Sequence, residues 1–108
     1  MTPDQKRYSA QICARATASA SKAMKRYPQP NYVLTKVAEE AGEVVKAGVH
    51  FAEGRDFTWE DLEDEVIDTI AMCLRLLTEG DQVIVITPPE TQSIYVTVSD
   101  AEALRSFP

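Results

Sequence analysis

The chain has 108 residues, of which 44% are hydrophobic and 26% are charged, as is usual for a single globular domain. Its formal net charge of −6 argues against a nucleic-acid polymer as partner, because such proteins normally carry a basic patch. No apolar run is long enough to span a bilayer, and MTPDQKRYSA lacks the apolar segment of a signal peptide, so we expect a cytoplasmic protein that does not bind membranes.

The N-terminal segment predicts a helix that begins near Thr2. Thr2 and Gln5 have the spacing of a capping box, and Pro3 suits the first helical position. Apolar and small residues then recur at steps of three and four as far as Tyr27, which is typical of an amphipathic helix. The small residues of ARATASASKA would let another helix approach closely, and the prolines of YPQPN end the helix.

Two further helices follow. We expect Asn31 to cap the second helix, which runs to about Ala52. After the connection EGRDF, Thr58 and Asp61 have a second capping-box spacing, and the third helix ends at Gly80. Helices joined by so short a loop are expected to pack side by side and antiparallel.

The C-terminal part changes character. VIVIT and SIYVTV are β-branched runs separated by PPETQ, which predicts a β-hairpin, and SDAEALRSFP begins with a capping signal for a last short helix. We therefore expect one domain over residues 1–108. Its helical core would cover about residues 2–80, and the hairpin with the short helix about residues 82–108.

Cysteine and histidine content argues against a zinc or di-iron site. Cys13 and Cys73 lie on the apolar stripes of expected helices, so we expect both to be reduced and buried, with a disulfide as the less common alternative. His50 is the only histidine, and the Glu-x-x-His pairs of ferritin-like di-iron proteins do not occur.

Three glutamates share one side of the second helix, in the stretch KVAEEAGEVV. Glu39, Glu40 and Glu43 spread over roughly 100° of its circumference, with Lys36 near the middle of that arc. Glu40 lies at the border with the apolar side of the helix. This pattern alone is equally typical of a solvated surface.

The third helix carries two kinds of carboxylate. Its first turns hold Glu60, Asp61, Glu63 and Asp64, which the helix dipole explains. Glu65 and Asp68 share a face at the start of a segment that is apolar around nearly the whole circumference. Because such a helix is buried on several sides, these two carboxylates are expected to be partly desolvated, and buried charges need a partner or a metal ion.

Packing the second helix on the third would bring five carboxylates together: Glu39, Glu40, Glu43, Glu65 and Asp68. A salt-bridge network is the rival explanation, but basic residues nearby are too few for it. Several hard oxygen ligands without Cys or His favour Mg²⁺, with Mn²⁺ as a substitute, over zinc. The sequence therefore predicts a magnesium site between these helices.

The two half-motifs, Glu39-Glu40-x-x-Glu43 and Glu65-x-x-Asp68, resemble the signature of the MazG-like all-α nucleoside triphosphate pyrophosphohydrolases. The resemblance covers about residues 31–77. It implies an all-α antiparallel bundle completed by formation of a homodimer or homotetramer. It also implies Mg²⁺-dependent cleavage of an NTP or dNTP between the α and β phosphates. The family commonly continues into a fourth helix, where this sequence instead predicts the hairpin.

By the same resemblance, Glu40, Glu43, Glu65 and Asp68 would bind the metal. Glu39 would bind a metal or orient the attacking water, so that Glu39 and Glu40 are the expected catalytic residues.

Three further residues are candidates for substrate binding. Lys36 could hold a phosphate or pair with Glu40 along the helix, and Arg75 could contact a phosphate or form an ion pair between subunits. Trp59 could stack on a base or anchor the preceding loop.

Two other functions fit the same residues. One is phosphoribosyl-ATP pyrophosphohydrolase, which KVAEEAGEVV and the apolar run after Asp68 also suit. The other is a non-catalytic module for helical oligomerisation or nucleotide sensing, in which the acidic cluster is structural. Oligomers are expected in each case, since the apolar surface of the helices exceeds what a chain of this length can cover.

Overall fold

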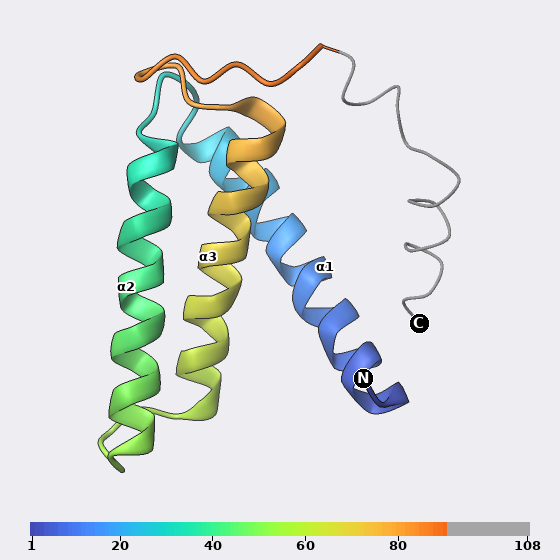
Figure 1. Ribbon diagram of the computed structural model, residues 1–108, viewed down its shortest axis with the longest axis vertical. Helices are drawn as coiled ribbons and strands as arrows, with labels where there is room; N and C mark the ends of the chain where they lie inside the picture. The colour runs from blue at the N-terminus through green and yellow to red at the C-terminus, as the bar shows by residue number, and fades with distance from the viewer. Residues whose placement is uncertain (91–108) are drawn as a thin grey trace.

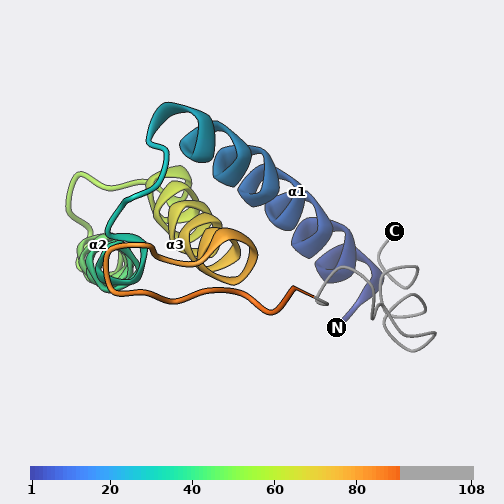
Figure 2. The same ribbon diagram turned by 90° about the horizontal axis from the view of Figure 1, so that it is seen from above.

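The computed structural model describes residues 1–90, and these residues form three α-helices and no β-strand. The helices are α1 (Pro3–Arg26), α2 (Val33–Ala52) and α3 (Trp59–Glu79). Figure 1 shows α2 and α3 side by side, whereas α1 diverges from them toward its N-terminus. Seen from above, α1 crosses the pair obliquely (Figure 2). Because α3 packs against both other helices, it is the central element of the fold.

Small side chains dominate the core of this arrangement. Ala16 and Ala20 of α1 are buried, as are Ala47 of α2 and Ala71 of α3. Their small size lets α1 and α2 approach α3 closely, as the composition of ARATASASKA predicted for α1. The residues at the ends of the predicted α1 stripe remain exposed, with Tyr8 at 41% and Tyr27 at 53%. The fully buried residues of α1 therefore lie in its middle turns.

The ends of α1 and α3 confirm the predicted caps. The Oγ1 atoms of Thr2 and Thr58 each accept a hydrogen bond from a backbone N–H three residues on, and both capping boxes are complete. Gly80 ends α3 with φ of 75°, a conformation that L side chains rarely adopt. A Cβ at this position would lie 2.0 Å from the carbonyl oxygen of Ile86, so glycine is required here.

The predicted cap of α2 is wrong. Asn31 donates its side-chain amide to the carbonyl oxygen of Tyr27, and α2 begins after Tyr32 without a side-chain cap of its own. The carboxylate of Asp81, which is buried, accepts a hydrogen bond from the N–H of Leu34 at 3.0 Å. Asp81, which lies 47 residues after Leu34 in the sequence, thus caps α2, and no local sequence motif predicts this cap.

The first strand of the predicted hairpin is also absent. Residues 82–85 form a turn, closed by two backbone hydrogen bonds between Asp81 and Ile86 at 3.0 and 2.8 Å. Asp81 Oδ1 accepts hydrogen bonds from the N–H groups of Val83 and Ile84, and such local side-chain bonds compete with strand formation. The second strand and the last short helix fall outside residues 1–90.

The cysteine prediction holds only in part. Cys13 and Cys73 are both free, but Cys13 is exposed and Cys73 is half-buried. Burial was the wrong expectation for Cys13, which lines an open, mostly apolar groove with Val66 and Ile70 of α3. Among residues 1–90, none of the helices has an apolar stretch of the length and hydropathy needed to cross a membrane.

Candidate metal site and its groove

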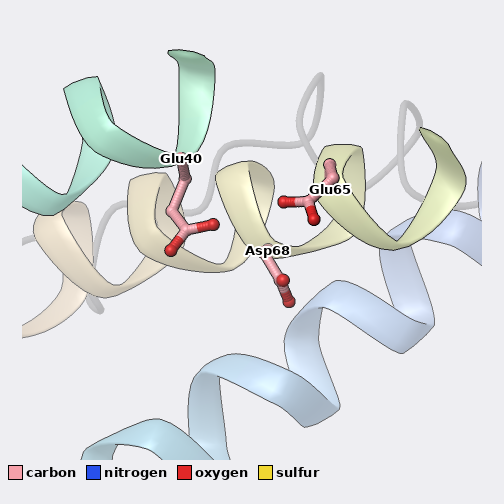
Figure 3. A group of neighbouring side chains, drawn as sticks. All are labelled: Glu40, Glu65 and Asp68. Atoms are coloured by element: carbon pink, nitrogen blue, oxygen red, sulfur yellow. The ribbon is translucent and has the colours of Figure 1, made fainter. Parts of the chain in front are cut away.

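Three of the predicted site residues come together where α2 packs on α3. Figure 3 shows Glu40 reaching from α2 toward α3, which supplies Glu65 and Asp68. One carboxylate oxygen from each lies within 4.8 Å of the other two. We refer to Glu40, Glu65 and Asp68 as the carboxylate trio.

The surroundings of the trio disfavour its negative charge. The pKa of Glu40 is raised by burial first, and then by repulsion from Asp68 and Glu65. Burial, followed by repulsion from Asp68 and Glu43, likewise raises the pKa of Glu65. The pKa of Asp68 is also raised, by desolvation and then by Asp64, although Asp68 is an exposed residue, unlike the half-buried Glu40 and Glu65. Within residues 1–90, no member of the trio forms an ion pair.

The donor set fits a hard divalent cation. Two oxygens on opposite sides of an octahedral Mg²⁺ lie about 4.2 Å apart, twice the usual Mg–O distance. The three carboxylate oxygens of the trio lie within 4.8 Å of one another, which is slightly more than this value. A small rotation of a glutamate side chain would close the difference. All three ligand atoms are carboxylate oxygens, which suits Mg²⁺ or Mn²⁺ better than zinc.

The other two glutamates of α2 lie outside the trio. Glu43 is exposed, yet it is near enough to raise the pKa of Glu65 by repulsion. Glu39 is exposed as well, and its Oε2 lies 3.8 Å from the ammonium nitrogen of Lys36. The structure therefore gathers three of the five predicted carboxylates and leaves two at the edge of the cluster.

A groove of about 360 Å³ extends from the trio between the three helices. Lys36, Glu40, Asp68 and Arg75 all line it, and we call the part beside Arg75 its far end. Asp68 and Arg75 are separated by seven residues of α3, or about 10 Å along the helix axis at 1.5 Å per residue. The groove is open because α1 contributes only small side chains, Ser19 and Ala23, to its central wall.

Arg75 is engaged within the chain. Its guanidinium is buried, with 2% of the residue exposed, and it forms an ion pair with Glu79. It also donates to the carbonyl oxygens of Ala23, at 3.3 Å, and Tyr27. Ala23 lies in the last turn of α1 and Tyr27 is its C-cap residue, so Arg75 joins the end of α1 to α3.

Trp59 lies away from this groove. Its indole N–H donates to the hydroxyl of Tyr8 at 3.1 Å, and its ring meets that of Phe51 edge to face at 5.7 Å. Trp59 lines a second, mostly apolar groove between the diverging half of α1 and the other helices. Trp59 thus contacts α1 and α2 and is not among the residues that line the groove beside the trio.

Two groove residues were not identified as site residues from the sequence. Asn31 was interpreted as a helix cap and Tyr27 as part of the α1 stripe, yet both line the far end of the groove. The two prolines of YPQPN could have indicated this position, because they end α1 and the chain reverses there. The reversal places this segment beside the end of α3. Gln29, in the same segment, donates to Glu79 and to the carbonyl oxygen of Gly80, both at 3.2 Å.

Comparisons of this chain with protein-family models, with curated proteins and with solved structures found no match in any of the three.

Proposed function

We propose that this protein is a Mg²⁺-dependent pyrophosphohydrolase that cleaves an NTP or dNTP into a nucleoside monophosphate and pyrophosphate. The observation that carries the proposal is the carboxylate trio, which forms no ion pair within residues 1–90 and of which Glu40 and Asp68 line a groove. Lys36 and Lys46 oppose the raised pKa values of Glu40 and Glu65 only as lesser causes. A cluster of this kind loses its mutual repulsion when a divalent cation binds. The two half-motifs on α2 and α3 support the same reaction by their resemblance to MazG-like enzymes.

In this proposal, Glu40, Glu65 and Asp68 hold the cation, and Glu43 joins them from the edge of the cluster. Magnesium, when bound, supplies positive charge to the phosphate oxygens and acts as a Lewis acid toward the attacking water. Glu39 accepts the proton of that water as its oxygen attacks the α phosphorus and the bond to the bridging oxygen breaks. Lys36, which lines the groove, contacts the phosphates.

The substrate is a nucleotide rather than a nucleic-acid polymer, because the groove is short and the chain is acidic. A cation at the trio is needed before an anionic substrate can approach, since Asp68 and Glu40 line the groove. Substrate binding is therefore expected to require the metal.

The proposal includes a homodimer or homotetramer. Leu34, Val45, Val49 and Phe51 of α2 are between 40% and 65% exposed, which is high for large apolar side chains on one helix. A second copy of the chain is the partner we expect to cover them. Analytical ultracentrifugation at micromolar concentration should show the dimer or tetramer, and a monomer under these conditions would contradict this part of the proposal.

Turnover is tested by incubating the protein with each NTP, each dNTP and phosphoribosyl-ATP, with Mg²⁺ or with EDTA, and measuring the released phosphates. Pyrophosphate that forms only with Mg²⁺ is the expected result. Release of orthophosphate would contradict cleavage between the α and β phosphates. No turnover, combined with no effect of Mg²⁺ on the melting temperature, would favour the non-catalytic module.

A further inference from the structure

The far end of the groove differs in chemistry from the end that holds the trio. Apart from its charged and polar residues, the groove is lined by apolar side chains, namely Val33 from α2, Ala71 and Met72 from α3, and Ala23 from α1. The cation nearby, Arg75, is already engaged by Glu79 and two carbonyl oxygens. The guanidinium of Arg75 is therefore not available to a phosphate, whereas a flat, weakly polar group would find a matching surface here.

Asn31 adds one oriented polar group to this surface. Its Nδ2 lies 3.2 Å from the carbonyl oxygen of Tyr27. Because a carbonyl can only accept, this bond places the NH₂ group toward Tyr27 and leaves Oδ1 as the free end of the amide. No hydrogen bond to Oδ1 is formed within residues 1–90, and this atom is not among the buried atoms that lack a partner. Asn31 Oδ1 is thus an accessible acceptor on the groove wall.

Tyr27 supplies an aromatic ring beside this acceptor. The residue is 53% exposed and lines the groove, and the guanidinium carbon of Arg26 lies 5.5 Å from the centroid of its ring. Arg26 covers one face by a cation–π contact, which leaves the opposite face for another planar group. Stacking of a nucleobase on such a ring depends little on which base it is.

We propose that Tyr27 and Asn31 form the base-binding end of the groove, with Asn31 selecting bases that carry an amino group on C6 of a purine or C4 of a pyrimidine. This inference rests on the proposed function, since it assumes that the ligand of the groove is a nucleotide. The acceptor Oδ1 pairs with the amino group of adenine or cytosine. Guanine, uracil and thymine place an acceptor oxygen at the corresponding ring position, and two acceptors repel each other. The trio lies about 10 Å along α3 from this end, so phosphates and base occupy opposite ends.

The test measures binding of the four monophosphates AMP, CMP, GMP and UMP by isothermal titration calorimetry in the presence of Mg²⁺. Wild-type protein should bind AMP and CMP roughly three- to tenfold more tightly than GMP and UMP, which is the range that one hydrogen bond supplies. Asn31→Ala should bind all four with nearly equal affinity. Tyr27→Leu should weaken all four by at least about fivefold, and Tyr27→Phe should restore binding.

Thr35→Ala is the matched control. Thr35 lies on the first turn of α2, donates to the carbonyl oxygen of Tyr32 and does not line the groove, so the base preference should be unchanged. Asn31→Ala should fold, because the carbonyl oxygen of Tyr27 keeps its bond from Arg75. The inference is overturned if no monophosphate binds at millimolar concentration, if wild type lacks the preference for AMP and CMP, or if Asn31→Ala retains it.

Turnover separates this inference from the proposed function. A preference for AMP and CMP in binding, without release of pyrophosphate from any triphosphate, would support the base-binding end and reject the hydrolase. Equal release of pyrophosphate from ATP, CTP, GTP and UTP, unchanged by Asn31→Ala, would support the hydrolase and reject the base-binding end.

Discussion

Glu63 and Asp64 immediately precede Glu65 on α3, with Asp68 one turn further on, yet the fold surrounds these carboxylates differently. Arg15 of α1 lies 3.8 Å from Glu63 and 3.2 Å from Asp64, and the hydroxyl of Tyr8 donates to Glu63. Glu65 and Asp68 face Glu40 instead, and no member of this trio forms an ion pair within residues 1–90. Acidic residues that the protein itself satisfies are structural, whereas a partly desolvated cluster without partners calls for a cation from solution.

The largest expected effect separates Asp68 from Asp64. Asp68→Asn removes a proposed metal ligand, so turnover should fall by more than about 100-fold. Changing a residue that only hydrogen-bonds to a metal ligand already costs up to about 100-fold. Asp64→Asn removes a similar charge four residues away and breaks only an exposed pair with Arg15, so turnover should stay within about twofold. Steady-state kinetics with the preferred triphosphate compares the two variants. Equal losses in both would show that the two groups of carboxylates do not differ in function.

Asp81 is a buried carboxylate whose hydrogen bonds all come from the protein itself, in contrast to the trio. Its buried carboxylate accepts hydrogen bonds from Leu34, Val83 and Ile84, and the bond from Leu34 is the largest cause of its lowered pKa. Asp81→Ala leaves these N–H groups without an acceptor, and we expect the melting temperature to fall by roughly 5–10 °C. Differential scanning calorimetry in EDTA measures this change. Thr87→Ala, just beyond the turn, is the control and should change the melting temperature by less than about 2 °C.

The elements that depend on local signals were predictable from the sequence. Both capping boxes and the stop at Gly80 use residues within three or four positions of the helix end, and all three were predicted. The exposed state of Cys13 was not, because it depends on how α1 packs against α3. Asp81 shows the same limit, since its bond to Leu34 spans 47 residues. VIVIT has the composition of a strand, but the Asp81 side chain binds the backbone that a strand would need.

The candidate site was predictable to the level of which helix faces meet. Spacing placed Glu65 and Asp68 on one face and Glu40 at the border of the α2 contact, and these are the three that come together. Spacing could not decide how far Glu39 and Glu43 reach, because they sit at the edge of the contact and are exposed. Nor could it find Asn31 and Tyr27 in the groove, since their position depends on the chain reversal between α1 and α2.

A metal ion bound at the trio should raise the free energy of unfolding, because it removes the repulsion among the three carboxylates. Mg²⁺ at about ten times its dissociation constant adds about 1.4 kcal/mol to the free energy of unfolding, which raises the melting temperature by roughly 5–8 °C. Asp68→Asn should lose most of this increase, and Asp64→Asn should keep it. Thermal melts with increasing MgCl₂ measure the effect, with NaCl of matched ionic strength as the control for screening. An equal increase in NaCl would show that screening, rather than a bound metal, relieves the repulsion.

The smallest expected effect is the pH dependence of stability without metal. The pKa values of Glu40 and Glu65 are raised above their ordinary 4.5, so the folded state binds more protons than the unfolded state between the ordinary and raised values. Stability should therefore rise as pH falls from 7 through the raised pKa values, and this gain is complete below 4.5. The pKa of Asp81 is lowered from 3.8, so its contribution is present above that value and is lost as pH falls further.

The two kinds of carboxylate thus predict a maximum of stability in EDTA near the ordinary carboxyl pKa, which urea unfolding at a series of pH values would locate. Glu65→Gln should flatten the rise between pH 7 and 5, because it removes one raised group and its repulsion of Glu40. Asp64→Asn should flatten the rise less, because Asp64 raises the pKa of Glu65 less than burial, Asp68 or Glu43 do, and raises the pKa of Asp68 less than burial does. A steady loss of stability from pH 7 to 5 in wild type would mean that the carboxylates of the trio do not repel one another. The affinity for a cation is inferred from that repulsion and would then lose its basis.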